Sequence, residues 1–314
     1  MRVTEHLDKS TDTLFSFEII PPPRGKTVAD IIAIVEQVAP VNPPFIDVTS
    51  HVAEANYDEL PDGTIRRRVR KKRPGTISIC GIIQNRYGID TVPHLLCTGF
   101  TREETEDAII ELNYLGIQNV LAIRGDESNY LKVLDKSRSR NKYATDLVEQ
   151  LTNLRNGEYL DDLANSEPIN FCVGVGGYPE KHVEAPNFKM EIKHLKKKVE
   201  AGADYIVSQM FFNNDDFTNY VKMCREADIT VPIIPGLKLI ESVRQLTSLP
   251  KHFHVTLPDA LVDEIVESPK HVKEIGQRWG KQQVEGLMND GAECVHFYVM
   301  NDASPVVKVI QELI

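Results

Sequence analysis

The sequence has few cysteines and no long apolar segment. Its five cysteines, at positions 80, 97, 172, 224 and 294, stand singly without a C-x-x-C pair, which argues against a disulfide framework and a thiolate zinc site. No apolar run reaches the roughly 18 to 20 residues that a transmembrane helix needs, and residues 1–12 lack the apolar centre of a signal peptide. These absences predict a cytoplasmic protein with reduced thiols and no membrane contact.

The sequence also lacks an excess of positive charge, since its formal net charge is -10 and its pI is near 5.5. Affinity for nucleic acid depends on basic surface, so this balance favours a small-molecule substrate and no nucleic-acid partner. One basic run, RRRVRKKR at residues 66–73, departs from the acidic background. We interpret this run as the solvated face of a helix, with a nucleic-acid patch as the alternative.

The nucleotide and metal motifs are incomplete. GKT at residues 25–27 lacks the glycine that a phosphate loop needs five positions earlier, where Ile20 stands. VGVGGYP at residues 173–179 leads into Pro179 instead of the helix that a dinucleotide fingerprint requires. His94 and Cys97 lack the further ligands of a closed metal site. We therefore predict no metal, and we expect the glycines to let backbone approach a ligand.

Short apolar segments alternate with amphipathic ones along the chain. Strands are predicted at residues 14–20, 45–49, 91–97, 117–123, 169–175, 205–210, 231–237 and 294–300. Helices are predicted at residues 28–38, 77–84, 101–115, 144–154, 189–201, 215–227, 241–249 and 272–290, with long connections at 125–142 and 249–270. Eight such units predict an α/β fold, a (β/α)8 TIM barrel forming one catalytic domain over residues 1–314, with an open sheet as the alternative.

The first predicted strand contains a carboxylate in apolar surroundings. In FSFEIIPPP, at residues 15–23, Glu18 lies among two phenylalanines and two isoleucines, and three prolines then end the strand. A buried carboxylate without a partner costs several kcal/mol or keeps its proton through a raised pKa. Glu18 is therefore the first candidate for acid–base chemistry.

Other polar residues lie at or just past the ends of predicted strands. They are Thr49, His94, Arg124 with Asp126, Gln209 and Tyr298. In a barrel, the carboxyl ends of the strands converge on one mouth, so we expect these side chains to meet there. A structural ion pair between Arg124 and Asp126 is an alternative reading of that motif. The lysines at 196–198 are either a solvated helix face or partners of a phosphate-bearing cofactor.

Several motifs of this sequence, in their order along the chain, resemble those of the methylenetetrahydrofolate reductase family, whose members are flavin-dependent barrels. The likeness runs from Phe15 to Asn301 and is carried by FSFEIIPP, PHLLC, LAIRGD, KYATDLV, GYPEKHVEA, LKKKVEAGADYIVSQMFF, IIPG and HFYVMN. The resemblance implies FAD as cofactor, NADH or NADPH as co-substrate, and a folate substrate. We also expect a homo-oligomer.

The resemblance also implies roles for individual residues. Glu18 would be the general acid that opens the folate ring, and Asp126 would stabilise the resulting cation and tune the flavin. The implied FAD-binding residues are Thr49, His94, Arg124, Gly125, Asp126, Tyr143, His182, Ala185, His194, Lys197 and Lys198. Substrate contacts are expected from Gln209, Gln245 and Tyr298, and Thr49 would also face the nicotinamide or folate. Asp302 departs from the arginine that the family often carries after the HFYVMN motif.

A flavin-free barrel lyase or aldolase is the alternative enzyme class. Lys238, at the end of PGLK, would then form a Schiff base with a carbonyl substrate.

Overall fold

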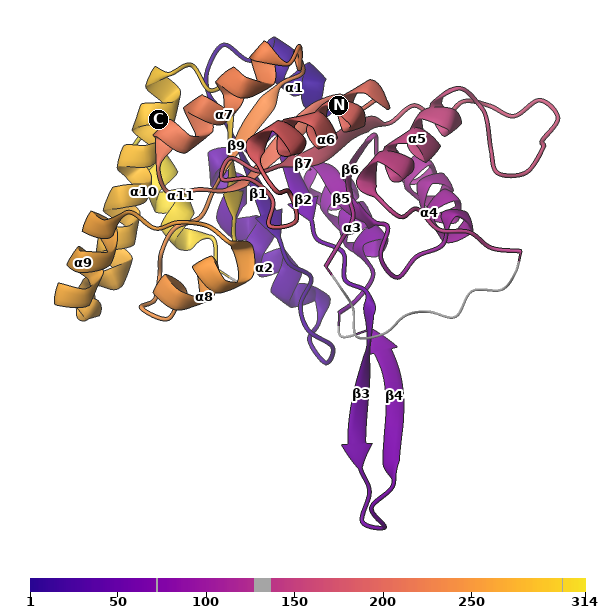
Figure 1. The fold of residues 1–314 in the computed structure, drawn as a ribbon, viewed down its shortest axis with the longest axis horizontal. Helices are drawn as coiled ribbons and strands as arrows, with labels where there is room; N and C mark the ends of the chain where they lie inside the picture. Colours follow the sequence, from indigo (N-terminus) through magenta and orange to yellow (C-terminus); the bar gives the residue numbers. More distant parts are fainter. Residues whose placement is uncertain (72, 127–136, 301) are drawn as a thin grey trace.

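The computed structural model describes residues 1–71, 73–126, 137–300 and 302–314. Within these residues, eight parallel strands close into a barrel in the order β1-β10-β9-β8-β7-β6-β5-β2 (Figure 1). The strands are β1 (Leu14–Ile19), β2 (Phe45–Val48), β5 (Asp90–Leu96), β6 (Asn119–Ile123), β7 (Cys172–Gly177), β8 (Tyr205–Met210), β9 (Ile233–Leu237) and β10 (Cys294–Tyr298). The predicted barrel and its eight strands are therefore confirmed, although β6, β7 and β9 begin later than expected.

Helices surround the barrel and bury one face each. They are α1 (Val3–Lys9), α2 (Val28–Val38), α3 (Thr76–Tyr87), α4 (Arg102–Tyr114), α5 (Ala144–Arg155), α6 (Phe188–Glu200), α7 (Asn214–Glu226), α8 (Gln245–Phe253), α9 (Asp259–Glu267), α10 (Val272–Asn289) and α11 (Ser304–Gln311). A capping box opens α4: Thr101 Oγ1 accepts from the Glu104 amide at 3.1 Å, and Glu104 accepts from the Thr101 amide at 3.0 Å. Among the described residues, no helix has both the length and the apolar character needed to span a bilayer.

Two sequence interpretations are wrong. The basic run is not a helix face: its residues 66–71 lie in β4 (Ile65–Lys71), which pairs antiparallel with β3 (Ala53–Glu59) outside the barrel. Ile65 and Val69 favour extended backbone, and the turn at residues 60–64 carries Gly63 at φ +79°. Residues 249–270 are not a long loop, because they hold the end of α8 and all of α9, whose Leu261 and Ile265 are buried.

Other boundaries also differ from the prediction. Helices α1 and α11 were not expected, and α8 begins four residues after position 241, where its helix was predicted to start. Of the connection predicted at residues 125–142, residues 127–136 lie outside the described chain.

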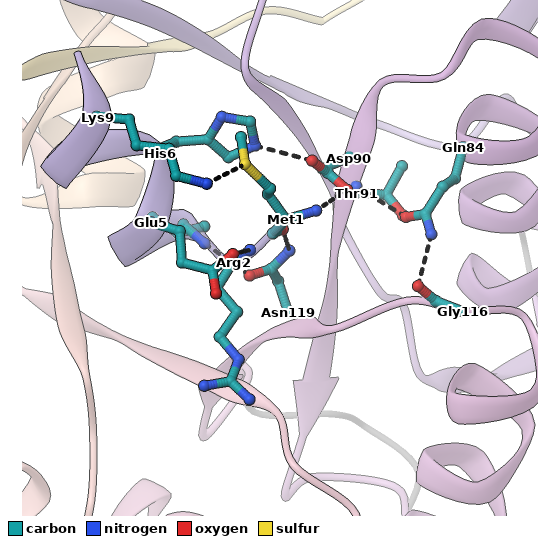
Figure 2. Close-up of polar contacts among 11 residues, drawn as sticks. Met1, Arg2, Glu5, His6, Lys9, Gln84, Asp90, Thr91, Gly116 and Asn119 are labelled. Atoms are coloured by element: carbon teal, nitrogen blue, oxygen red, sulfur yellow. Dashed lines mark hydrogen bonds and ion pairs between the residues drawn. The ribbon is translucent and has the colours of Figure 1, made fainter.

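Helix α1 closes the amino-terminal end of the barrel. Val3 and Leu7 pack on interior residues such as Phe45 and Leu121. Figure 2 shows how polar contacts fix the helix: the Met1 amino group lies 2.7 Å from Asp90 Oδ1, and His6 Nε2 lies 2.8 Å from Asp90 Oδ2. Because this end is packed and apolar, a site inside the barrel has to open at the carboxyl ends of the strands.

Candidate active site

Strand alternation turns one carboxylate of β1 toward the barrel interior. Phe17 and Ile19 point outward into the core between strands and helices, whereas Glu18 points inward with 16% of its side chain exposed. Parallel pairing places Glu18 beside Asp47 of β2 and Tyr298 of β10. The predicted convergence of strand-end residues is therefore observed for Glu18 and Tyr298.

His94 joins this group from β5. Its Nε2 lies 3.5 Å from Glu18 Oε2 and 3.4 Å from Asp47 Oδ2. Burial lowers the pKa of His94, and the neighbouring Glu18 opposes that shift. The imidazole is therefore held mainly neutral between two carboxyl groups.

The environment of Glu18 favours its protonated form. Burial raises the pKa of Glu18 from 4.5 to about 7, and Asp47 acts in the same direction, while His94 and Lys238 oppose the shift. A carboxyl group with a pKa near neutral pH exists in both protonation states under working conditions. Glu18 can therefore deliver a proton to a bound ligand and recover one afterwards.

Asp47 is the part of this cluster that our sequence reasoning missed. Its side chain is 1% exposed, and neither carboxyl oxygen has a hydrogen-bond partner among the described residues. Burial raises the pKa of Asp47 well above its ordinary value. The sequence did carry a signal for Asp47. In FIDV, at residues 45–48, it is a carboxylate within an apolar strand, as Glu18 is in FSFEI at residues 15–19.

Lys238, just past β9, and Tyr298, at the end of β10, line the same mouth. Lys238 Nζ donates to Tyr298 O at 3.1 Å, and the Tyr298 hydroxyl donates to Ser208 O at 2.6 Å. Burial lowers the pKa of Lys238, opposed by Glu241 and Glu18. Tyr298 is thereby anchored across the interior, close to the acidic cluster.

The two predicted glutamines are oriented by backbone contacts. Gln209, near the end of β8, accepts from the Met210 amide through Oε1 at 2.9 Å. Gln245, at the start of α8, accepts through Oε1 from the amides of Glu241 and Ser242 at 2.6 and 2.9 Å. These contacts turn the carbonyl end of each side chain toward protein backbone.

The RGD segment follows β6. Arg124 makes a two-pronged ion pair with Glu184 at 2.7 and 2.6 Å, a carboxylate partner that the sequence did not suggest. Gly125 has φ +82°, a conformation that favours glycine. Burial, then the charge of Arg73, lowers the pKa of His51 to about 4, and Asp126 opposes that shift.

The loop after β7 contains His182 and Ala185. The His182 amide donates to Glu191 Oε2 at 3.1 Å, and its ring makes an edge-on contact with Tyr178 at 4.6 Å. The Ala185 amide donates to His182 O at 2.9 Å, which closes a tight turn. These contacts fix the loop against α6.

The three predicted residues of α6 face different ways. Lys198 turns inward and donates through Nζ to Gly176 O at 2.8 Å, and burial lowers its pKa while Glu191 opposes that shift. His194 and Lys197 are exposed. Tyr143 precedes α5 and is 51% exposed, with Lys142 Nζ 5.2 Å from its ring centre. Roles for these residues in binding a cofactor stay predictions.

Thr49 lies immediately past β2. Its amide donates to Ile19 O at 3.1 Å, which continues the pairing of β1 with β2. Its Oγ1 is buried and lacks a hydrogen-bond partner among the described residues, as do His94 Nε2 and His51 Nδ1. Buried polar atoms of this kind usually have partners, so their gathering at one mouth suits a polar ligand.

Comparison with known proteins gives consistent matches. Methylenetetrahydrofolate reductase 1 of Schizosaccharomyces pombe is 31% identical over 98% of this chain and 47% of that protein. The 5,10-methylenetetrahydrofolate reductase of Buchnera aphidicola is 29% identical over 91% of this chain and 86% of that protein. A solved protein of Clostridium thermocellum that binds two copies of 5-methyl-5,6,7,8-tetrahydrofolic acid shares the fold, with a TM-score of 0.60, 11% identity and coverage of 99% and 98%.

The extent of these matches differs between relatives. The chain spans about half the length of the eukaryotic relatives and most of the length of the bacterial ones. The family model described as methylenetetrahydrofolate reductase matches residues 2–314. The chain therefore belongs to the methylenetetrahydrofolate reductase family.

Proposed function

We propose that this chain reduces 5,10-methylenetetrahydrofolate to 5-methyltetrahydrofolate, with NADH or NADPH as electron donor and FAD bound at the barrel mouth. The observation that carries the proposal is Glu18, a carboxyl group with a pKa of about 7 at the mouth of a barrel of this family. Relatives named as NADH-dependent and NADPH-dependent reductases support a nicotinamide co-substrate.

The residues at the mouth fit a flavin nucleotide. Thr49, His51 and His94 each present a buried polar atom without a hydrogen-bond partner in the described chain. Arg124 of the RGD segment and the partly buried ammonium group of Lys198 add donors suited to an anionic ligand. The residues that would hold FAD are Thr49, His94, Arg124, Gly125, Asp126, Tyr143, His182, Ala185, His194, Lys197 and Lys198. Bound there, FAD would supply the hydride chemistry that no side chain provides.

Glu18 would supply the proton for the folate. Its carboxyl proton passes to the nitrogen of the folate bridge, the bond from that nitrogen to the methylene carbon breaks, and an iminium cation forms on the folate. Glu18 is left as a carboxylate. His94 and Lys238 then favour that charged form, since both lower the pKa of Glu18. Asp126 would stabilise the cation by its negative charge.

The nicotinamide and the folate would use one pocket in turn, in a ping-pong cycle. Thr49, Gln209, Gln245 and Tyr298 would contact whichever substrate is bound. Gln209 and Gln245 are already oriented by backbone amides, so little side-chain entropy remains to be lost on binding. Tyr298 is similarly held by its bond to Ser208 O.

The test separates the two half reactions by rapid mixing. The purified protein should be yellow, and NADH or NADPH should bleach it. Glu18→Gln should keep flavin and its reduction by nicotinamide but lose about 10²- to 10⁴-fold in folate reduction, because only that step needs a general acid. Glu285→Gln, an exposed site, is the control. Equal loss in both half reactions would remove Glu18 from this role.

One observation favours a second candidate function, a Schiff-base lyase. Burial lowers the pKa of Lys238, as a reactive lysine requires. That function predicts a colourless protein that borohydride traps with a carbonyl substrate through Lys238. A flavin spectrum together with turnover of Lys238→Met would exclude it.

A further inference from the structure

A cavity lies beside the barrel mouth, between helices α7, α9 and α10. Helix α10 packs against both of the other helices (Figure 1). The cavity has a volume of about 390 Å³, which is enough for a small organic molecule. It is lined by the loop from β8 to α7, the segment after β9, the connection from α8 to α9, and α10. Of the described lining residues, only Lys238 also belongs to the mouth, so the cavity is a separate candidate site.

Much of the cavity lining is apolar. Gly276 allows α10 to approach the barrel closely, because a Cβ at this position would lie 1.9 Å from Ile240 O. Ile240 and Leu261 line the cavity and are buried. Trp279 adds an aromatic side chain, and its Nε1 donates to Glu264 Oε2 at 2.9 Å, which holds the indole ring in place. These side chains can contact the apolar body of a ligand.

Two buried acceptor atoms at the cavity lack a hydrogen-bond partner among the described residues. Asn214 Nδ2 donates to Gln283 O at 2.9 Å, which fixes the orientation of the amide and leaves its Oδ1 unpaired. Glu180 lies next to the cavity, since its Oε2 accepts from the amide of the lining residue Thr256 at 2.8 Å, and its Oε1 is unpaired. A ligand that satisfies these atoms has to donate hydrogen bonds.

Two carboxyl groups at the cavity also lack a neighbouring cation. Asp216 lines the cavity, and burial, then the charge of Asp215, raises its pKa. Burial raises the pKa of Glu180, hydrogen bonding by Thr256 opposes that shift, and the charge of Asp216 adds to it. No cation of the described chain lowers either pKa. A positive charge in the cavity would therefore stabilise both carboxylates.

Lys238 does not supply that positive charge. Its Nζ donates to Tyr298 O at 3.1 Å, and the carboxylates that raise its pKa are Glu241 and Glu18. A metal ion is not indicated either, because the described chain contains no group of three or more His, Cys, Asp or Glu residues that could hold one. The ligand class that matches the cavity is therefore an organic cation.

We propose that this cavity binds a primary ammonium compound with a compact apolar body. A primary ammonium group has three hydrogen-bond donors, and the acceptors available to it belong to Asn214, Asp216 and Glu180. The apolar body would pack against Leu261 and Trp279, and an aromatic ring also attracts a nearby ammonium group. This site is independent of the flavin and folate that we assign to the mouth.

Three probes with the same ring and different head groups test the ligand class. They are cyclohexylmethylamine, which is cationic, cyclohexylmethanol, which is neutral, and cyclohexanecarboxylate, which is anionic. Trp279 is the only tryptophan of the chain, so tryptophan fluorescence of the purified full-length protein reports binding at the cavity. The amine should bind with a Kd of about 1 mM or tighter, and the other two probes at least about tenfold more weakly. Equal binding of the alcohol, tighter binding of the carboxylate, or no saturable change with the amine would overturn the proposal.

Three variants test the residues. Asp216→Asn should weaken binding of the amine about tenfold, because it removes a charged acceptor. Asp215→Asn is the matched control: it removes the same charge from the same first turn of α7 at an exposed position that does not line the cavity, and should stay within about twofold of the wild type. Gln282→Glu adds a carboxylate at an exposed lining position and should tighten binding about threefold. Equal effects of the two aspartate variants, or weaker binding by Gln282→Glu, would contradict an ammonium site.

Discussion

Replacing Glu18 with glutamine should stabilise the folded protein at alkaline pH. The folded chain holds the Glu18 proton up to a pKa of about 7, whereas the unfolded chain releases it near 4.5. The native state therefore binds more protons between these values, and the free energy of unfolding falls as pH rises through this window. A glutamine side chain has the same shape but no proton to lose, so the variant avoids this loss.

The magnitude follows from the shift in pKa. Each unit corresponds to about 1.4 kcal/mol, so a rise from 4.5 to about 7 makes the wild type roughly 3 kcal/mol less stable above pH 7 than a permanently neutral side chain would. Below pH 4.5 the carboxyl is protonated in both states and the difference disappears. Keeping Glu18 buried as a proton donor therefore lowers the free energy of unfolding at neutral and alkaline pH.

Urea unfolding at pH 5 and at pH 8 measures this difference. The stability gap between Glu18→Gln and the wild type should widen by on the order of 2 to 3 kcal/mol from pH 5 to pH 8. Glu285→Gln, on the exposed surface of α10, should show no such widening. A gap that stays constant with pH would refute the claim that the fold keeps Glu18 protonated.

Three further variants test separate parts of the structure. Asp47→Asn should stabilise the protein at pH 8 in urea titration, since burial keeps Asp47 protonated. The same variant should retain folate reduction, measured by stopped flow, within about threefold because this side chain is 1% exposed. Gly276→Ala should destabilise by at least about 3 kcal/mol, because the new Cβ would lie 1.9 Å from Ile240 O, whereas Gly75→Ala should be nearly neutral in urea titration. Lys198→Met should weaken flavin retention by about tenfold, measured by flavin fluorescence on dilution.

The barrel was predictable because its strands and helices have different apolar periods. Residues 14–19 alternate between an outer core and the interior, and α2 buries Ile31, Ile34, Val35 and Val38 at helical spacing. The hairpin was not predictable in this way, because neither of its strands buries a continuous face and charge alone does not distinguish helix from strand. Helix α1 was missed because its seven residues bury only Val3 and Leu7.

The candidate site was predictable where one residue carried an unusual signal. Glu18 stood out as a carboxylate in an apolar strand, and His94 meets it because β5 is separated from β1 only by β2. Asp47 carried the same signal but was read only as part of a buried strand. The partnership of Arg124 with Glu184 was beyond sequence reasoning, since 60 residues separate them and only the closed barrel brings their loops together.

Because α1 closes the amino-terminal end of the barrel, the structure has a consequence for when Glu18 can be protonated. Val3 and Leu7 pack this end of the barrel in the described chain, so we expect protons to reach Asp47 and Glu18 from the opposite end, through the opening that a ligand would cover. Occupancy then isolates the two carboxyls from bulk water. Glu18 must therefore carry its proton before the ligand arrives, and after giving that proton to the ligand it recovers another only when the ligand has left, so the pH of the medium sets the fraction of molecules that bind the ligand ready to react.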